Sequence, residues 1–312
     1  MPGVAKPDIS AGDAITVVYS SPSVVGGTSP IATACTPASG STFPLGSTTV
    51  SWTATDAQQR ASTCTLTVTV TAPPRIRRTK VVAFGDSITL GQDGQDSLTV
   101  RSPGPLTFLK SVYLSGREYP TVLLAALQAR YTLQAGALVM TNQGLSAEPA
   151  GDPTTLTRFT SAISGTQVVL ILEGSNDLYN GFRDSLTVEA GLTCLQRMVR
   201  AAKAAGVVAL LATVPPMNPT GCTPACRGFS AALVPAFNDR IRLLAATENV
   251  TLVDVYKEFN GDLTLISPDG LHPNAAGYER IASAFFQSIK GTLEQPATVG
   301  AVAPQPTTPV AE

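Results

Sequence analysis

The chain has 312 residues, of which 44% are hydrophobic and only 14% charged, and its formal net charge is −1. This length favours one large domain together with a smaller one, and the near-neutral charge offers no basic surface to nucleic acid or to anionic lipid. The longest apolar runs, such as residues 207–212, fall far short of the roughly 20 residues that span a bilayer, so we expect no membrane insertion.

The amino-acid composition also indicates the compartment in which the protein works. The chain is rich in Thr, Ser and Ala and poor in Lys and Glu, and its five cysteines permit two disulfides and one free thiol. These features are typical of proteins from oxidising compartments. We therefore expect a secreted, extracellular protein of bacterial origin.

Residues 1–73 carry strand signals only. Segments 14–19, 47–53 and 63–71 are rich in Val and Thr, and the last of them alternates with period two, as a half-buried strand does. Trp52 is expected to lie in the core, where large aromatic side chains usually pack. The pattern predicts a small all-β domain over residues 1–73.

The same segment has an ordered set of landmarks. Cys35, a Ser-Gly-Ser turn at 39–41, a Pro-Leu-Gly turn at 44–46, the strand around Trp52 and finally Cys64 follow one another. This order resembles the HYR module, an immunoglobulin-like β-sandwich associated with extracellular adhesion. The resemblance implies a disulfide between Cys35 and Cys64, and a module that contacts polysaccharide or a cell surface.

Two segments are expected to lie outside packed domains. Residues 74–78 form a basic stretch that begins with Pro, and they read as a short, semi-rigid linker. Residues 293–312 are rich in Pro, Ala, Thr and Val without periodicity, and we predict a flexible tail there.

From residue 79 the pattern changes to alternating strands and helices. Short apolar runs occur at residues 81–84, 137–141, 168–172, 207–212 and 251–255. Continuous runs of this length are typical of parallel strands covered on both faces, and amphipathic helical segments separate them. Residues 79–292 are therefore predicted to form a three-layer α/β sandwich, whose site should lie at the carboxyl ends of the strands.

Three segments at these strand ends carry side chains suited to acyl transfer. Ser87 stands in Gly-Asp-Ser directly after the first run, at a strand-to-helix turn. His272, the only histidine of the chain, follows Asp269 by three residues, which supplies an imidazole and the carboxylate that fixes its tautomer. Asn176 follows the third run and is a suitable amide donor to an oxyanion. A single histidine cannot build a His-rich zinc cluster, so no metal is expected.

Taken in order, these blocks resemble a known family. The sequence contains Gly85-Asp86-Ser87, Asn142, Gly174-x-Asn176-Asp177 and Asp269-x-x-His272. Residues 79–292 are similar in this respect to the SGNH (GDSL-like) hydrolases. The resemblance implies a flavodoxin-like α/β/α fold with a five-stranded parallel sheet, ester hydrolysis through an acyl-enzyme, and no metal or organic cofactor. It assigns Ser87 as nucleophile, His272 as base and Asp269 as the residue that orients the base.

The resemblance also implies an oxyanion hole made of the Ser87 backbone N–H, the Asn176 side chain and one N–H from the second block. Family members usually place Gly five residues after the Asn of that block, whereas here the position holds Ala147. Ala does not readily adopt positive φ, so the conformation of this loop is the point of departure. Gly144 is the next candidate donor, and Asn142 is a further candidate.

Other features leave alternatives open. Cys222 and Cys226 could close a small disulfide, although their short spacing makes the geometry demanding. The insertion at 91–117 follows the nucleophile and is expected to wall the acyl pocket or form a lid. The leading functional hypothesis is a secreted esterase for short acyl groups, including acetyl groups on carbohydrate. A lipase or phospholipase is the alternative within the class, and an adhesion or carbohydrate-binding protein with an inactive hydrolase fold is the alternative outside it.

Overall fold

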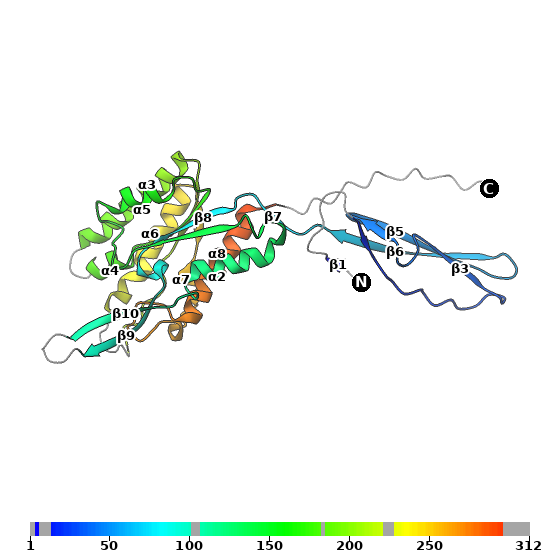
Figure 1. The fold of residues 1–312 in the computed structure, drawn as a ribbon, viewed down its shortest axis with the longest axis horizontal. Helices are drawn as coiled ribbons and strands as arrows, with labels where there is room; N and C mark the ends of the chain where they lie inside the picture. The colour runs from blue at the N-terminus through cyan, green and yellow to red at the C-terminus, as the bar shows by residue number, and fades with distance from the viewer. Residues whose placement is uncertain (1–3, 6–13, 101–106, 182–184, 221–227, 296–312) are drawn as a thin grey trace. The chain divides into compact units, whose positions relative to one another are not determined.

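The computed structural model describes residues 4–5, 14–100, 107–181, 185–220 and 228–295 of the chain. It divides into two units (Figure 1). The N-terminal unit is built mainly from residues up to Arg75, and the larger α/β unit from Ile76–Arg130 and Gln134–Glu294. Each unit is described below by itself.

The N-terminal unit is all-β, as predicted. Its strands are β1 (Val4–Ala5), β2 (Ala14–Thr16), β3 (Ala32–Thr36), β4 (Thr42–Pro44), β5 (Gly46–Thr55) and β6 (Ala61–Thr71). Strands β1, β6, β5 and β3 form one sheet in that order, and β2 pairs with β4 in a second. Alternate residues of the strands face inward and form one apolar core that includes Phe43, Val50, Trp52 and Val68.

The structure corrects the predicted disulfide between Cys35 and Cys64, because both residues are free thiols in it. Cys35 on β3 and Cys64 on β6 both pair with Trp52, which lies on the strand between them. Two strand spacings of about 4.8 Å place their Cα atoms roughly 10 Å apart, whereas a disulfide bridges at most about 7 Å. The second cysteine pair of the sequence prediction, Cys222 and Cys226, lies outside the described residues.

The α/β unit contains the predicted five-stranded parallel sheet. Its strands are β8 (Lys80–Gly85), β11 (Val139–Gly144), β12 (Val168–Leu172), β13 (Val208–Ala212) and β14 (Thr251–Val253). Their order in the sheet is β11-β8-β12-β13-β14, which is the flavodoxin-like arrangement. Every residue of β12 is buried, which explains the unbroken apolar run that predicted this strand.

Helices cover both faces of this sheet (Figure 1). The main ones are α2 (Tyr119–Arg130), α3 (Thr155–Ala162), α5 (Ser185–Ala204), α6 (Val234–Thr247) and α8 (Ala275–Leu293). Helices α2 and α8 lie together on one face, where Tyr119 stacks on Phe285 with 5.2 Å between ring centroids. Helices α3, α5 and α6 cover the other face, where Phe159 meets Phe84 of β8 edge to face at 5.0 Å.

The shorter elements of the unit are α1 (Ser87–Leu90), β9 (Gln92–Val100), β10 (Thr107–Tyr113), α4 (Ser175–Gly181), α7 (Val255–Phe259), and 3₁₀ turns at Gly228–Leu233 and Leu263–Leu265. The residues of β7 (Arg75–Ile76), β15 (Glu294–Gln295) and a 3₁₀ turn at Thr132–Gln134 are divided between the two units. Strand β7 falls within the predicted linker, and α8 extends to the start of the predicted tail, most of which lies outside the described residues. Among the described helices, none has the length and apolar character needed to cross a membrane.

The insertion at 91–117 folds into a hairpin of β9 and β10. The two strands pair antiparallel, with Tyr113 opposite Gln92 at the base of the hairpin. They form their own two-stranded sheet and do not extend the parallel one. The hairpin therefore leaves the α/β core directly after α1.

Candidate active site

Ser87 is the first residue of α1, two residues after the end of β8. Asp86 caps this short helix, and its Oδ1 accepts a hydrogen bond of 2.8 Å from the Ile88 N–H. Strand β8 ends at Gly85, where a methyl group would come within 2.0 Å of Thr89 Oγ1 and 2.1 Å of the Leu172 carbonyl oxygen. Glycine therefore allows the strand to approach β12 closely before the chain turns and presents Ser87.

His272 and Asp269 lie in the loop that precedes α8. The Nδ1 atom of His272 is 2.6 Å from Asp269 Oδ2, and its Nε2 atom is 2.8 Å from Ser87 Oγ. The Oδ1 atom of Asp269 accepts from the backbone N–H groups of Leu271 and His272, both at 3.0 Å. Because Nδ1 donates to the carboxylate, Nε2 is left to accept the serine proton.

The carboxylate of Asp269 is held in its charged form. Burial opposes its charge, but the hydrogen bond and charge of His272, together with the backbone donors, lower the pKa of Asp269 below its ordinary value. Both Asp269 and His272 are 1% exposed. A charged carboxylate in this place stabilises the imidazolium that forms when His272 takes a proton.

The three predicted oxyanion donors line one cleft. Ser87, Ala147 and Asn176 all contribute to its wall, and no hydrogen bond of the described loops uses the Ala147 N–H. Ala147 adopts φ of 62°, the left-handed conformation that the family glycine would take readily. One N–H of the Asn176 amide donates to the Glu148 carbonyl at 3.0 Å, which leaves the other for the cleft.

The two further candidates, Asn142 and Gly144, do not line this cleft. The Gly144 N–H donates to Asn142 Oδ1 at 2.9 Å, and Asn142 Nδ2 donates to the Thr89 carbonyl at 2.9 Å. Asn142 thus ties β11 to α1 by a hydrogen bond, and Gly144 packs closely against α1. The close approach is possible because a methyl group on Gly144 would lie 2.1 Å from the Leu90 nitrogen.

The cleft has a volume of about 300 Å³. It is lined by Ser87, Gln92, Ser146, Ala147, Asn176, Leu271 and His272. Sequence reasoning missed Gln92 and Ser146, which join in a hydrogen bond of 3.0 Å from Ser146 Oγ to Gln92 Oε1. Gln92 could have been found from its position in the insertion that follows the nucleophile.

The N-terminal unit has a cavity of about 230 Å³ beside Trp52. Among the residues that line it, Cys64 is the only titratable one.

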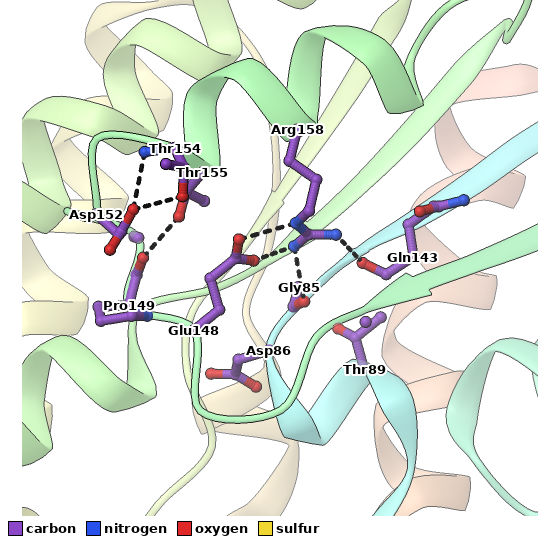
Figure 2. A network of polar contacts seen from close by, with 12 residues as sticks. Gly85, Asp86, Thr89, Gln143, Glu148, Pro149, Asp152, Thr154, Thr155 and Arg158 are labelled. Atoms are coloured by element: carbon purple, nitrogen blue, oxygen red, sulfur yellow. Dashed lines mark hydrogen bonds and ion pairs between the residues drawn. The ribbon is translucent and has the colours of Figure 1, made fainter.

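Two buried carboxyl groups, Asp86 and Glu173, directly follow the ends of β8 and β12. Burial raises the pKa of Asp86 to about 6, and its Oδ2 has no hydrogen-bond partner among the described residues. Burial, reinforced by the charge of Asp86, raises the pKa of Glu173 well above its ordinary value. Figure 2 shows the adjoining network in which Arg158 contacts Glu148.

Within the described residues, no group of three or more His, Cys, Asp or Glu side chains lies close enough together to bind a metal ion.

A parallel five-stranded sheet with serine, histidine and aspartate hydrogen-bonded at its carboxyl edge is characteristic of the α/β/α serine hydrolases. Residues 83–280 match the model of the GDSL-like Lipase/Acylhydrolase family, and residues 12–70 match that of the HYR domain. The chain therefore belongs to the GDSL-like lipase/acylhydrolase family, whose members are carboxylic ester hydrolases. Both resemblances drawn from the sequence are confirmed at the level of the family.

Known proteins agree with this assignment. A multidomain esterase of Ruminococcus flavefaciens is 29% identical over 145 residues, which are 46% of this chain and 18% of that protein. The chain thus spans about a fifth of that curated relative. The solved structure of LAE5, an alpha/beta hydrolase enzyme from the metagenome of Lake Arreo in Spain, is 26% identical with a TM-score of 0.50, over 69% of this chain and 96% of its own. Axe2, an acetylxylan esterase from Geobacillus stearothermophilus, shares the fold at 20% identity and a TM-score of 0.50, over 69% and 95% of the two chains.

Proposed function

We propose that the α/β unit hydrolyses carboxylic esters with short acyl groups, in particular acetyl groups on carbohydrate, through an acyl-enzyme on Ser87. One observation carries the proposal. Ser87, His272 and Asp269 form an unbroken chain of hydrogen bonds, 2.8 and 2.6 Å long, at a cleft that also holds amide donors. This assembly also argues against an inactive hydrolase fold.

In the first half of the reaction, Ser87 Oγ forms a bond to the ester carbonyl carbon while its proton passes to His272 Nε2. The carbonyl oxygen becomes an oxyanion, which accepts hydrogen bonds from the backbone N–H groups of Ser87 and Ala147 and from the Asn176 amide. The carboxylate of Asp269 keeps its hydrogen bond to Nδ1 and stabilises the imidazolium.

The tetrahedral intermediate then collapses. The bond to the alkoxy oxygen breaks, His272 Nε2 returns its proton to the departing alcohol, and the acyl group stays on Ser87 Oγ. Water repeats the sequence: it attacks the acyl carbon, gives a proton to Nε2, and releases the acid with the proton returned to Ser87. Each half passes through an oxyanion in the same place, so the same donors serve both.

The size and lining of the cleft support a small, polar substrate. Its volume of about 300 Å³ lies at the lower end for ligand pockets, and most of its lining side chains are polar. An acetyl group fits this description, whereas a lipase or phospholipase would need an extended apolar surface for its acyl chain. That an acetylxylan esterase has the same fold makes acetylated xylan the first carbohydrate to try.

Initial rates on p-nitrophenyl esters from acetyl to palmitoyl test the acyl preference, followed by a panel of acetylated polysaccharides. We expect the highest kcat/KM with the acetyl ester and no effect of EDTA. A maximum at long chains would favour the lipase alternative. Ser87→Ala should lower turnover by several orders of magnitude without unfolding the protein, and activity above about a tenth of wild type would contradict the nucleophile assignment.

We further propose that the protein is extracellular and that its N-terminal module contacts polysaccharide. The composition and the HYR family of residues 12–70 support this reading. Full-length Ser87→Ala protein, which cannot remove acyl groups, should co-sediment with insoluble polysaccharide. Immunodetection should find the natural protein in the culture medium. Absence of co-sedimentation, or a protein confined to the cells, would contradict the respective part.

A further inference from the structure

Arg158 is a partly buried cation that the reaction scheme does not use. It projects from α3 toward the end of β8, and its guanidinium lies over the Phe84 ring, 3.9 Å from the centroid. The guanidinium forms a two-point ion pair with Glu148, in which Nε donates to Oε1 at 2.8 Å and Nη2 donates to Oε2. The side chains of Glu148 and Arg158 are 5% and 24% exposed, so the carboxylate is shielded from water and the guanidinium is partly shielded.

The remaining donors of Arg158 reach the backbone. Nη1 donates to the Gln143 carbonyl at 2.7 Å, and Nη2 is 3.3 Å from the Gly85 carbonyl (Figure 2). A single planar group thus connects three points of the chain: the end of β8, the end of β11 and the loop that follows β11. Arginine suits this task because its donors form a rigid fork.

Two of these points, the end of β8 and the loop after β11, adjoin proposed oxyanion donors. Gly85 precedes Asp86 and Ser87, whose N–H is one donor, and Glu148 directly follows Ala147, whose N–H is another. The Glu148 carbonyl accepts the hydrogen bond from Asn176 Nδ2, which orients the third donor. The left-handed conformation of Ala147 is unfavourable for alanine, so the loop needs restraint from its neighbours.

We propose that Arg158, paired with Glu148, is a positioning residue that fixes the three oxyanion donors relative to one another. The inference rests on the proposed acyl-enzyme mechanism. Arg158 is not among the residues that line the cleft; it acts by fixing the peptide after β8 relative to the loop after β11. Preorganised donors stabilise an oxyanion because they need not reorganise during the reaction, and small displacements weaken this effect strongly.

The variant Arg158→Lys tests this role, because lysine keeps the positive charge but loses the planar fork. The matched control is Arg130→Lys, since Arg130 makes a similar two-point pair with Glu294 at 2.5 and 2.8 Å and neither residue lines the cleft. Glu148→Gln removes the ion pair but keeps the side-chain shape, and carries the same test if Arg158→Lys does not fold.

Two quantities should be measured in each protein: kcat/KM for p-nitrophenyl acetate, and the inhibition constant of trifluoroacetone. This ketone adds Ser87 Oγ to its carbonyl carbon, passes the serine proton to His272 and places an oxyanion among the donors. Arg158→Lys should lower kcat/KM by about 10- to 100-fold and raise the inhibition constant by the same factor. Glu148→Gln should show the same pattern with smaller factors. The melting temperatures of Arg158→Lys and Arg130→Lys should agree within about 3 °C.

Three results would overturn the inference. Arg158→Lys and Glu148→Gln could both match the Arg130→Lys control in kcat/KM within about twofold. Alternatively, kcat/KM could fall while the ketone binds as tightly as to wild type, which would mean that Arg158 acts outside the oxyanion hole. A wild-type protein that neither hydrolyses the ester nor binds the ketone would overturn the proposed function itself, and this inference with it.

Discussion

Gly94 packs directly against Asp269: a methyl group at residue 94 would come within 2.2 Å of the Asp269 Oδ1 atom and 2.4 Å of its Cγ. The same Oδ1 receives the backbone hydrogen bonds of Leu271 and His272. The neighbouring Asp93 accepts a hydrogen bond from Ser267 at 2.8 Å. The first residues of the β9–β10 hairpin therefore form the wall against which the carboxylate of the candidate triad rests.

Gly94→Ala should displace Asp269 and lower kcat by about 10- to 100-fold, because a carboxylate moved by even 1 Å no longer orients the imidazole. The backbone of Gly94 is not in the left-handed region, so the effect would be steric. Gly136→Ala is the matched control, since a methyl group there meets nothing within 4 Å. Equal p-nitrophenyl acetate turnover in the two variants would contradict the packing.

Replacement of Ala147 tests the loop conformation. Ala147→Gly should keep kcat within about twofold of wild type, because glycine adopts the observed φ of 62° readily and retains the N–H. Its free energy of unfolding should change by no more than about 1 kcal/mol, since relief of left-handed strain and the greater freedom of unfolded glycine oppose each other.

Ala147→Pro should abolish most activity. Proline removes the N–H and fixes φ near −65°, far from the native value. Circular dichroism must show that the fold is intact before the loss is attributed to the missing donor. A folded and fully active Ala147→Pro protein would place the third oxyanion donor elsewhere.

Asp86 should make stability depend on pH. Burial raises its pKa from 3.8 to about 6, so between these values the folded protein binds this proton more tightly than the unfolded chain does. This contribution to stability is present below pH 4 and is lost as the pH rises through 6, a change of about 3 kcal/mol. The pKa of Asp269 is lowered in the folded protein, so its contribution to stability has the opposite pH dependence: it is lost as the pH falls through the folded pKa.

The variant Asp86→Asn removes the first of these effects. Its free energy of unfolding relative to wild type should rise by about 2.4 kcal/mol between pH 4 and pH 7. Urea denaturation, followed through the unfolding transition of the α/β unit, measures this difference. Comparing the two proteins at each pH cancels the titration of groups far from Asp86, while Glu173, whose pKa the charge of Asp86 raises, adds a smaller change of its own. If the difference in unfolding free energy between the two proteins were the same at both pH values, the pKa of Asp86 would not be raised by burial.

The N-terminal thiols should be available to reagents. Cys64 is exposed and Cys35 half-buried, whereas Cys194 is buried in the α/β unit. Under non-reducing conditions, iodoacetamide should modify Cys64 rapidly and Cys194 only after denaturation, as followed by peptide mass spectrometry. Detection of a peptide that links Cys35 to Cys64 would contradict the strand register of the structure.

The parallel sheet was predictable from sequence because its central strands β8, β12 and β13 are buried on both faces and so appear as unbroken apolar runs. The runs at 81–84 and 168–172 lie within β8 and β12, and Ser87 and Asn176 follow the ends of these strands. In a parallel sheet, these ends meet at one edge, so short motifs could indicate a site before any distance was known.

Contacts that depend on register or on loop direction were not predictable. The order of Cys35, Trp52 and Cys64 suggested a disulfide, but only the strand pairing shows that Trp52 lies between the two thiols. The pairing of Arg158 with Glu148 joins a helix to a loop ten residues earlier, and no periodic pattern marks it. Local propensity describes elements, whereas such pairs arise from how the elements pack.

The β9–β10 hairpin has consequences for engineering. Its base is fixed to the α/β unit: the Gln92 carbonyl accepts a hydrogen bond of 2.7 Å from the Tyr278 hydroxyl, and Gly94 abuts Asp269. Beyond that base, the described residues of β9 and β10 pair with each other in a separate two-stranded sheet that projects from the core (Figure 1). Among the described residues of the hairpin only Gln92 lines the cleft, so libraries that randomise β9 and β10 beyond Gly94 should leave the hydrogen bonds of Ser87, His272 and Asp269 intact, whereas changes at residues 92–94 should disturb them.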